Sequence, residues 1–331
     1  MPEPLRLRVL GRSGMRVSEV CLGTMTFGTE WGFGADEAVC REIYGAFRDA
    51  GGNFVDTADV YTEGASETIL GRLVAGDRDA VVLSTKYSLP TDKADPNSAG
   101  NHRKNLRRSV EASLRRLGTD YLDLLWVHAW DECTPAEETL RALDDLVRSG
   151  AVLSIGVSNT PAWVVARSQA IAELRGWSEF CAVQVEYSLA ARTADRELLP
   201  MARSLGLTPC AWSPLARGLL TGKRRERDRP QRTRPSAADV AAEVAAELGT
   251  TPARVALAWV LRQGLLPVLG ARTLVQLRDN LGAVDVRLDD TQLERLDATT
   301  RVRPGYPHDF LRERRAALSP SALNDPAAQR G

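Results

Sequence analysis

The chain has 331 residues, of which 44% are hydrophobic and 26% are charged, a composition typical of a globular protein. Lysine plus arginine and aspartate plus glutamate each total 43, so the formal net charge is zero. This balance excludes an overall attraction to nucleic acid or to an anionic membrane surface. The length accommodates two average domains or one α/β barrel.

Targeting signals and disulfides are not expected from this sequence. The first six residues lack the apolar core of a signal peptide, and no apolar run approaches the roughly 20 residues needed to cross a bilayer. The five cysteines show no CxxC spacing, and Cys21, Cys181 and Cys210 lie in or beside apolar runs. We therefore expect buried free thiols and a reducing, cytoplasmic compartment.

Strand and helix patterns alternate along most of the chain. Two short strands within residues 7–18 flank the turn sequence Gly11-Arg12-Ser13-Gly14 and predict an N-terminal hairpin. The strands expected after it are 19–22, 53–55, 80–84, 121–127, 152–157, 182–185, 207–211 and 265–269. The expected helices are 36–50, 66–74, 102–117, 135–149, 161–174, 195–205, 237–248, 253–261, 274–281 and 289–296.

Eight strands that alternate with helices predict an α/β fold, a (β/α)8 TIM barrel with an N-terminal hairpin and an extra C-terminal helix. The alternative, a doubly wound sheet, needs a glycine-rich fingerprint after its first strand, and no GxGxxG occurs in the sequence. We expect one domain over residues 1–331, with a core at about 7–285. The extension at 286–331 is expected to be irregular beyond its helix.

Polar residues stand where several predicted strands end. Asp56 follows the second strand with Tyr61 five residues later, Lys86 follows the third strand, and His128 follows the fourth. Each alone has a structural explanation, such as a turn cap, a packing ring or a solvated ammonium. In a barrel, however, these strand ends meet at one rim, where barrel enzymes place their active sites. Together the four residues favour a proton-handling site.

The chemistry that these residues support is carbonyl reduction. A phenol has a pKa of about 10, and a buried ammonium beside it lowers that pKa while a carboxylate holds the ammonium in place. Tyr61 could then protonate an oxygen that gains negative charge, and His128 could orient that oxygen. Such charge develops when hydride attacks the carbon of an aldehyde or ketone.

Two other chemistries lack the residues that they need. The histidines, His102, His128 and His308, are scattered and have no cysteine or acidic partner at ligand spacing, so no metal site is expected. A GxSxG nucleophile elbow is also missing from the sequence, which argues against a hydrolase triad.

Long motifs in order resemble the aldo-keto reductase superfamily over about residues 7–285, in particular its aryl-alcohol dehydrogenase-like and channel β-subunit-like branch. The first motif runs from Asp56 to Glu67, and the second ends in GTDYLDLLWVH at His128. Shorter matches are GVSN at 156–159, QVEYS at 184–188 and WSPLARGLLTGK at 212–223.

The resemblance implies roles for the four rim residues. Asp56, Tyr61, Lys86 and His128 correspond to the family's catalytic tetrad. Tyr61 would be the general acid, Lys86 would depress its pKa, Asp56 would fix Lys86, and His128 would position the carbonyl. The implied function is reversible NADPH-dependent reduction of aldehydes or ketones to alcohols. The alternative is a cofactor-binding regulatory or partner-binding subunit of the same fold, and a third hypothesis is a cofactor-free lyase or hydrolase.

The resemblance also implies a nicotinamide cofactor, NADPH in preference to NADH. Ser158, Asn159 and Gln184 would hold its carboxamide, and Trp212 would stack on its ring. The other implied cofactor contacts are Thr24 and Met25 near the nicotinamide ribose, Ser213, Leu215 and Gly218 along the pyrophosphate, Gly270, Arg272, Gln276 and Asn280 at the adenosine 2′-phosphate and adenine, and also Gly23 and Asp56. A helix N-terminus and a guanidinium together favour a phosphate there. Gly270-Ala271 and Gln276 stand where many relatives carry Lys-Ser and Arg.

Two further features concern the rim of the expected site. Trp31, Tyr61, Trp130 and the loop at 88–101 are expected to border the substrate pocket, and its aromatic rings suggest a bulky or aromatic carbonyl. Residues 223–235 contain seven basic and two acidic side chains. They form either a solvated loop or a cationic flap over the pyrophosphate. The sequence indicates no oligomeric state.

Overall fold

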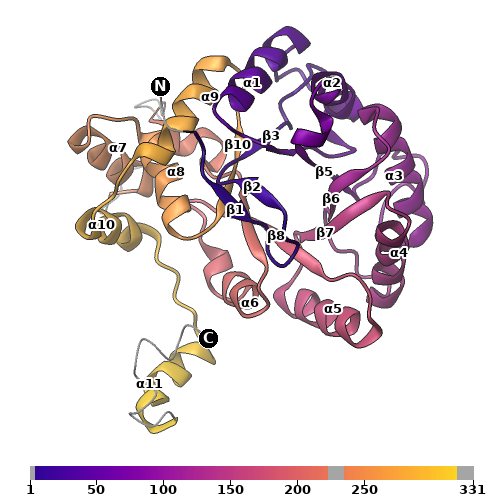
Figure 1. Cartoon of the computed structure of the whole chain (residues 1–331). Coiled ribbons are helices and arrows are strands. Elements are labelled where there is room, and N and C mark those ends of the chain that lie inside the picture. The colour runs from indigo at the N-terminus through magenta and orange to yellow at the C-terminus, as the bar shows by residue number, and fades with distance from the viewer. Residues whose placement is uncertain (1–3, 223–234, 319–331) are drawn as a thin grey trace.

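The computed structural model describes residues 4–222 and 235–318. Eight parallel strands close into a barrel in the order β10-β3-β4-β5-β6-β7-β8-β9, with helices around its outside (Figure 1). The barrel strands are β3 (Cys21–Gly23), β4 (Phe54–Asp56), β5 (Val82–Tyr87), β6 (Leu122–Val127), β7 (Val152–Ser158), β8 (Phe180–Glu186), β9 (Thr208–Trp212) and β10 (Leu266–Gly270). The predicted (β/α)8 architecture is confirmed.

The predicted N-terminal hairpin forms and lies across one end of the barrel (Figure 1). Its strands are β1 (Leu7–Val9) and β2 (Arg16–Ser18). Leu10 and Val17 are fully buried and pack against residues inside the barrel. Gly11 has φ +53°, and a Cβ there would lie 1.9 Å from the carbonyl oxygen of Cys181, so only glycine allows this approach. The hairpin therefore closes the end opposite the strands' C-termini.

The helices around the barrel start and stop where local sequence signals place them. Thr251 caps α8 with its hydroxyl and Pro252 opens it, while Gly118 and Gly176 end α3 and α5 in the left-handed conformation. The helices are α1 (Glu37–Asp49), α2 (Ala65–Val74), α3 (Arg103–Leu117), α4 (Ala136–Arg148), α5 (Ala162–Arg175), α6 (Leu198–Ser204), α7 (Ala237–Glu247), α8 (Pro252–Arg262), α9 (Leu274–Leu281), α10 (Asp290–Thr300) and α11 (His308–Leu318). In none of the described helices is there a stretch both long and apolar enough to cross a membrane.

Two differences from the sequence prediction have clear causes. The expectation of an irregular tail was wrong at α11, whose eleven residues include helix formers such as Leu, Arg, Glu and Ala, and Figure 1 shows this helix apart from the barrel. Strand β5 was expected to stop at residue 84 but continues to Tyr87, so Lys86 lies within the strand and pairs in register with Trp126. The prediction ended the strand where its apolar residues end. The strand continues further because a buried ion pair allows a charged residue inside it.

The barrel interior is filled only partly by apolar side chains. Phe54, Trp126, Leu124 and Leu266 are essentially fully buried in one cluster together with the hairpin and three cysteines. The five cysteines are free, and four of them are buried, as predicted for Cys21, Cys181 and Cys210. Polar residues replace this apolar filling toward the C-terminal ends of the strands. The C-terminal rim of the barrel is therefore where the fold can place an active site.

Candidate active site

A pocket of about 1020 Å³ opens at the C-terminal ends of the barrel strands. Its walls come from residues of five barrel strands, β3, β4, β8, β9 and β10, and from the segments that follow the barrel strands. The predicted site residues that line it are Gly23, Met25, Trp31, Asp56, Tyr61, His128, Asn159, Gln184, Trp212, Ser213, Leu215, Gly218, Gly270, Arg272, Gln276 and Asn280. The volume lies at the upper end of the range for small-molecule and cofactor sites.

Asp56 and Lys86 form a buried ion pair at the base of this pocket. Asp56 is the last residue of β4 and Lys86 lies in β5, and their exposed fractions are only 2% and 1%. Lys86 Nζ donates to Asp56 Oδ2 and, over 2.8 Å, to the carbonyl oxygen of Thr57, while Ser84 Oγ donates to Asp56 Oδ1 over 2.6 Å. Burial disfavours the ammonium, but Asp56 and Tyr61 outweigh burial and raise the pKa of Lys86. Lys86 therefore stays charged.

Tyr61 lies directly over this ion pair. Its ring belongs to the turn after β4, with the Lys86 ammonium 4.9 Å from the ring centroid. Burial raises the pKa of Tyr61, and the nearby Lys86 charge lowers it without cancelling the effect of burial. The expected lowering by Lys86 is thus present, but the net pKa of Tyr61 stays above its ordinary value. The phenol keeps its proton near neutral pH, as a general acid must.

His128 faces Tyr61 across the pocket. It follows β6, and its ring meets the Tyr61 ring edge-on with centroids 5.9 Å apart. Burial, and then the Lys86 charge, lower the pKa of His128 to about 3, so its imidazole is neutral at physiological pH. Its Nδ1 atom has no hydrogen-bond partner among the described residues. A neutral imidazole beside a phenol can orient one small polar group between them.

The depressed pKa of His128 predicts a loss of stability in acid. The unfolded chain protonates this histidine below about pH 6.5, whereas the folded chain does so only near pH 3. The free energy of unfolding should therefore fall by up to about 1.4 kcal/mol per pH unit as the pH drops below about 6.5. We expect the free energy of unfolding, measured with urea, to fall less steeply with decreasing pH (a flatter acid limb) in His128→Gln than in the wild type.

The matched control for this prediction is His308→Gln, which removes a partly exposed histidine that contacts Glu197 on the surface. This control should keep the wild-type acid limb. An unchanged limb in His128→Gln would contradict the neutral, buried state that we assign to His128.

The residues expected at the nicotinamide carboxamide and ribose divide into some that line the pocket and some that lie behind its wall. Asn159 and Gln184 line the pocket; Asn159 Nδ2 donates to the His128 carbonyl oxygen over 2.8 Å, and Gln184 Nε2 donates to Asp56 over 3.3 Å. Ser158 and Thr24 are fully buried behind them and are not among the lining residues. The hydroxyl of Ser158 donates to the Gln184 carbonyl oxygen over 2.9 Å. These two side chains support the wall from behind.

The segment after β9 presents an unusual run of left-handed residues to the pocket. Ser213, Ala216, Arg217 and Gly218 have φ values of +52°, +49°, +54° and +90°. Ser213, Arg217 and Gly218 line the pocket beside Trp212. The N–H groups of Ala216 and Gly218 donate to the carbonyl oxygens of Ser213 and Leu215, and that of Arg217 donates to the Ser213 hydroxyl, so the turn is held by its own hydrogen bonds. The exposed Arg217 side chain supplies the positive charge at this part of the pocket.

The far end of the pocket is formed by the start of α9. Thr273 caps this helix by accepting from the Gln276 amide, and the amide oxygen of Gln276 accepts from the Arg272 N–H over 2.8 Å. Asn280 is buried and donates to the Gly270 carbonyl oxygen over 3.2 Å. The exposed Arg272 side chain and the N-terminus of α9 together favour an anion.

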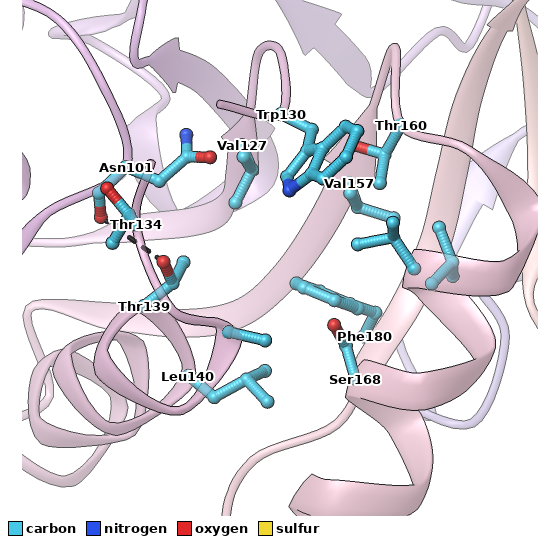
Figure 2. A pocket seen from close by; sticks show the side chains of 13 residues that line it. Asn101, Val127, Trp130, Thr134, Thr139, Leu140, Val157, Thr160, Ser168 and Phe180 are labelled. Carbon is cyan, nitrogen blue, oxygen red and sulfur yellow. Dashed lines mark hydrogen bonds between the residues drawn. The ribbon is translucent and has the colours of Figure 1, made fainter. Parts of the chain in front are cut away.

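Trp130 does not lie where the sequence prediction places it. It is absent from the lining of the large pocket and instead borders a separate cavity of about 30 Å³ between β6, β7, α4 and α5. Figure 2 shows the Trp130 ring beside Val157 and Thr160, with Leu140 and Phe180 further in. The reason is its packing, since the indole meets Trp163 edge-on at 5.8 Å. Trp130 is therefore no wall of the large pocket.

The structure adds pocket residues that the sequence prediction missed. Phe33, Leu89 and Arg217 also line the pocket. Phe33 lies two residues after Trp31, and their rings are 5.9 Å apart. Leu89 falls inside the loop predicted to border the substrate. Their loops follow strand ends, which was the available signal, but no local pattern tells which loop side chain turns inward.

Two other expectations concern metal ions and the basic segment. Over residues 4–222 and 235–318 no cluster of His, Cys, Asp or Glu is arranged to hold a metal ion. The basic stretch predicted at 223–235 lies outside the described residues except for Pro235.

Comparisons with known proteins show the family of this chain. Residues 19–301 match the family model of the Aldo/keto reductase family. The chain is 39% identical to norsolorinic acid reductase stcV of Emericella nidulans, over 91% of this chain and 83% of that protein. It is 41% identical to the uncharacterized oxidoreductase YrpG of Bacillus subtilis, over 87% and 94%, and 32% identical to the putative aryl-alcohol dehydrogenase AAD14 of Saccharomyces cerevisiae, over 94% and 92%. The chain therefore belongs to the aldo/keto reductase family and is an NAD(P)H-dependent oxidoreductase.

Proposed function

We propose that this protein is an NADPH-dependent reductase of aldehydes or ketones in which Tyr61 is the general acid. The observation that carries the proposal is the arrangement at the base of the pocket. A protonated phenol and a neutral imidazole face one another at 5.9 Å, and a fully buried Lys86–Asp56 pair lies behind the phenol. This set of groups suits an oxygen that becomes negative during reaction.

Each residue of the set has one part in the proposed step. The nicotinamide supplies hydride to the carbonyl carbon when it is bound. Tyr61 gives its phenolic proton to the carbonyl oxygen, and the charge of Lys86 stabilises the phenolate that remains. Asp56 keeps Lys86 charged and in place through the ion pair. His128 orients the oxygen between its own ring and that of Tyr61.

The pocket offers groups that fit each part of a dinucleotide. Asn159 and Gln184 would bind the carboxamide, and Trp212 would stack on the nicotinamide ring. The segment from Ser213 to Gly218, with the Arg217 guanidinium, would meet the pyrophosphate. Met25, which is 45% exposed, would cover the nicotinamide ribose. Gly270 and Asn280 would border the adenine at the far end.

Arg272 is the residue that we expect to select NADPH. The Arg272→Ala variant should raise KM for NADPH about tenfold or more, because hydrogen bonds to a charged group contribute about 1.5–3 kcal/mol. KM for NADH should hardly change, because NADH has no 2′-phosphate. Initial rates with both cofactors at saturating substrate measure the two values.

The control for this experiment is Arg278→Ala, which removes an exposed charge from the last turn of the same helix, outside the pocket lining. It should leave both KM values unchanged. An equal rise of both KM values in Arg272→Ala would show that Arg272 does not read the 2′-phosphate.

An aromatic carbonyl is the substrate class that the pocket favours. Trp31 and Phe33 form an aromatic wall beside Tyr61, with the Trp31 and Tyr61 rings 6.4 Å apart at an angle of 78°. Perpendicular and tilted rings of this kind accept a planar ring by stacking or edge contact. The name of one relative, aryl-alcohol dehydrogenase, agrees with this class.

The test is turnover by the purified protein. Mixed with NADPH and a panel of aromatic and aliphatic aldehydes and ketones, it should consume NADPH fastest with the aromatic members. Tight cofactor binding without turnover of any carbonyl would favour a regulatory subunit instead. The five free cysteines support the further proposal that the protein works in the reducing cytoplasm.

A further inference from the structure

The turn that carries Tyr61 has a rare backbone conformation. The three residues after Tyr61 are all left-handed, Thr62 with φ 46° and ψ 44°, Glu63 with φ 57° and ψ 30°, and Gly64 with φ 91°. A β-branched residue such as threonine is a genuine outlier in this region, because its Cβ crowds the backbone. Such conformations persist only where surrounding contacts hold them.

The contacts of the Thr62 side chain are those that hold this turn. Thr62 is fully buried, and its hydroxyl donates to the Phe27 carbonyl oxygen over 2.7 Å. The same hydroxyl accepts from the Ser66 N–H over 3.0 Å, near the start of α2. One hydroxyl therefore ties the residue after Tyr61 both to its own helix and to a loop that is distant in sequence.

That distant loop carries Trp31 and Phe33, which form the aromatic wall of the pocket. Gly28 follows Phe27, and a Cβ at Gly28 would lie 2.9 Å from the Thr62 hydroxyl, so the two segments are in close contact. The N–H of Gly28 donates to the Ala35 carbonyl oxygen over 2.9 Å and closes the loop that contains Trp31 and Phe33. Thr62 thus connects the turn that carries Tyr61 to the loop that carries Trp31 and Phe33.

We propose that Thr62 is a positioning residue that fixes the Tyr61 phenol and the aromatic wall of Trp31 and Phe33 as one unit. Its hydroxyl sets the distance between the acid and the surface on which an aromatic substrate rests. This inference rests on the proposed carbonyl reductase function. It extends that function because one residue, Thr62, would fix both the proton donor and the surface that selects aromatic carbonyls.

Thr62→Val and Thr62→Ser test the hydroxyl separately from the shape of the side chain. Valine keeps the shape and removes the hydroxyl, so kcat with an aromatic aldehyde should fall about 10-fold to 100-fold, since small misplacements of reacting groups are costly. KM for NADPH should not change. Serine keeps the hydroxyl and should restore kcat to within about threefold, because the geometry of Tyr61 is retained.

A second readout is the ratio of kcat/KM for an aromatic aldehyde to that for a small aliphatic aldehyde. In Thr62→Val this ratio should fall, because displacement of the wall affects only substrates that contact it. A purely structural role for Thr62 would lower the melting temperature without changing either kcat per folded molecule or this ratio. Thr68→Val is the control, since it removes another hydroxyl that donates to a backbone oxygen, that of Gly64, on α2.

If Thr62→Val does not fold, Thr62→Gly tests the same role of the hydroxyl. Glycine accepts the left-handed backbone without strain but has no hydroxyl, so it should fold and show the same fall in kcat. Wild-type kcat in Thr62→Gly, or in a folded Thr62→Val, would overturn this inference alone. A wild-type protein that turns over no carbonyl would overturn the proposed function first, and this inference with it.

Discussion

Replacement of Tyr61 by phenylalanine is expected to lower kcat by about 10²-fold to 10⁴-fold, the usual contribution of a general acid. The variant loses only the phenolic O–H, and the ring can still pack against His128 and Trp31. Without it the carbonyl oxygen loses the proton donor that we propose beside Lys86. The rate of NADPH oxidation with an aromatic aldehyde measures the loss.

Cofactor binding separates this chemical effect from damage to the pocket. The affinity of Tyr61→Phe for NADPH, followed by nicotinamide fluorescence, should match that of the wild type. Tyr121→Phe is the matched control because it removes a phenol whose hydroxyl donates to Asp79 on the surface, over 2.9 Å. Turnover within a few-fold of wild type in Tyr61→Phe would remove Tyr61 from the role of acid.

The second large effect is expected at the Asp56–Lys86 pair. Lys86→Met should lower the free energy of unfolding by about 3–5 kcal/mol, because it leaves the Asp56 carboxylate buried without its partner. Turnover should also be lost, because no charge remains to stabilise the Tyr61 phenolate. Urea unfolding and steady-state kinetics measure the two effects on the same preparation.

The double variant Asp56→Asn/Lys86→Met separates stability from catalysis. It removes both charges, and asparagine can still accept a hydrogen bond from Ser84, so most of the lost stability should return. Turnover should not return. If the double variant regains both stability and activity, the pair is only structural and the role given to Lys86 is wrong. If it regains neither, the loss in Lys86→Met does not come from the unpaired carboxylate.

Strand ends made much of this site predictable. Asp56 ends β4 and His128 follows β6, and strands that run parallel around a barrel bring such residues to one rim. Lys86 was also expected at the rim, although its strand proved longer than its apolar run. The tail was less predictable, because the apolar side chains of α11, Phe310, Leu311 and Leu318, remain exposed and form no packed face.

Loop side chains were the least predictable part of the pocket. Trp31 and Trp130 both stand in loops after strands, yet Trp31 lines the large pocket while Trp130 turns to pack against Trp163. Phe33 and Leu89 turn inward without any motif to mark them. A loop has no fixed side-chain period comparable to that of a strand or helix, so its orientation depends on its neighbours.

The sequence by itself determined the barrel, the order of its elements and the polar residues at one rim, because periodicity and strand-end polarity are local properties of the chain. Only the tertiary structure decided the charge state and the contacts of those residues. Burial keeps the proton on Tyr61 and keeps His128 neutral, and the Thr62 hydroxyl joins two segments that lie far apart in sequence. These effects depend on the surroundings that distant elements create, and no local pattern encodes them.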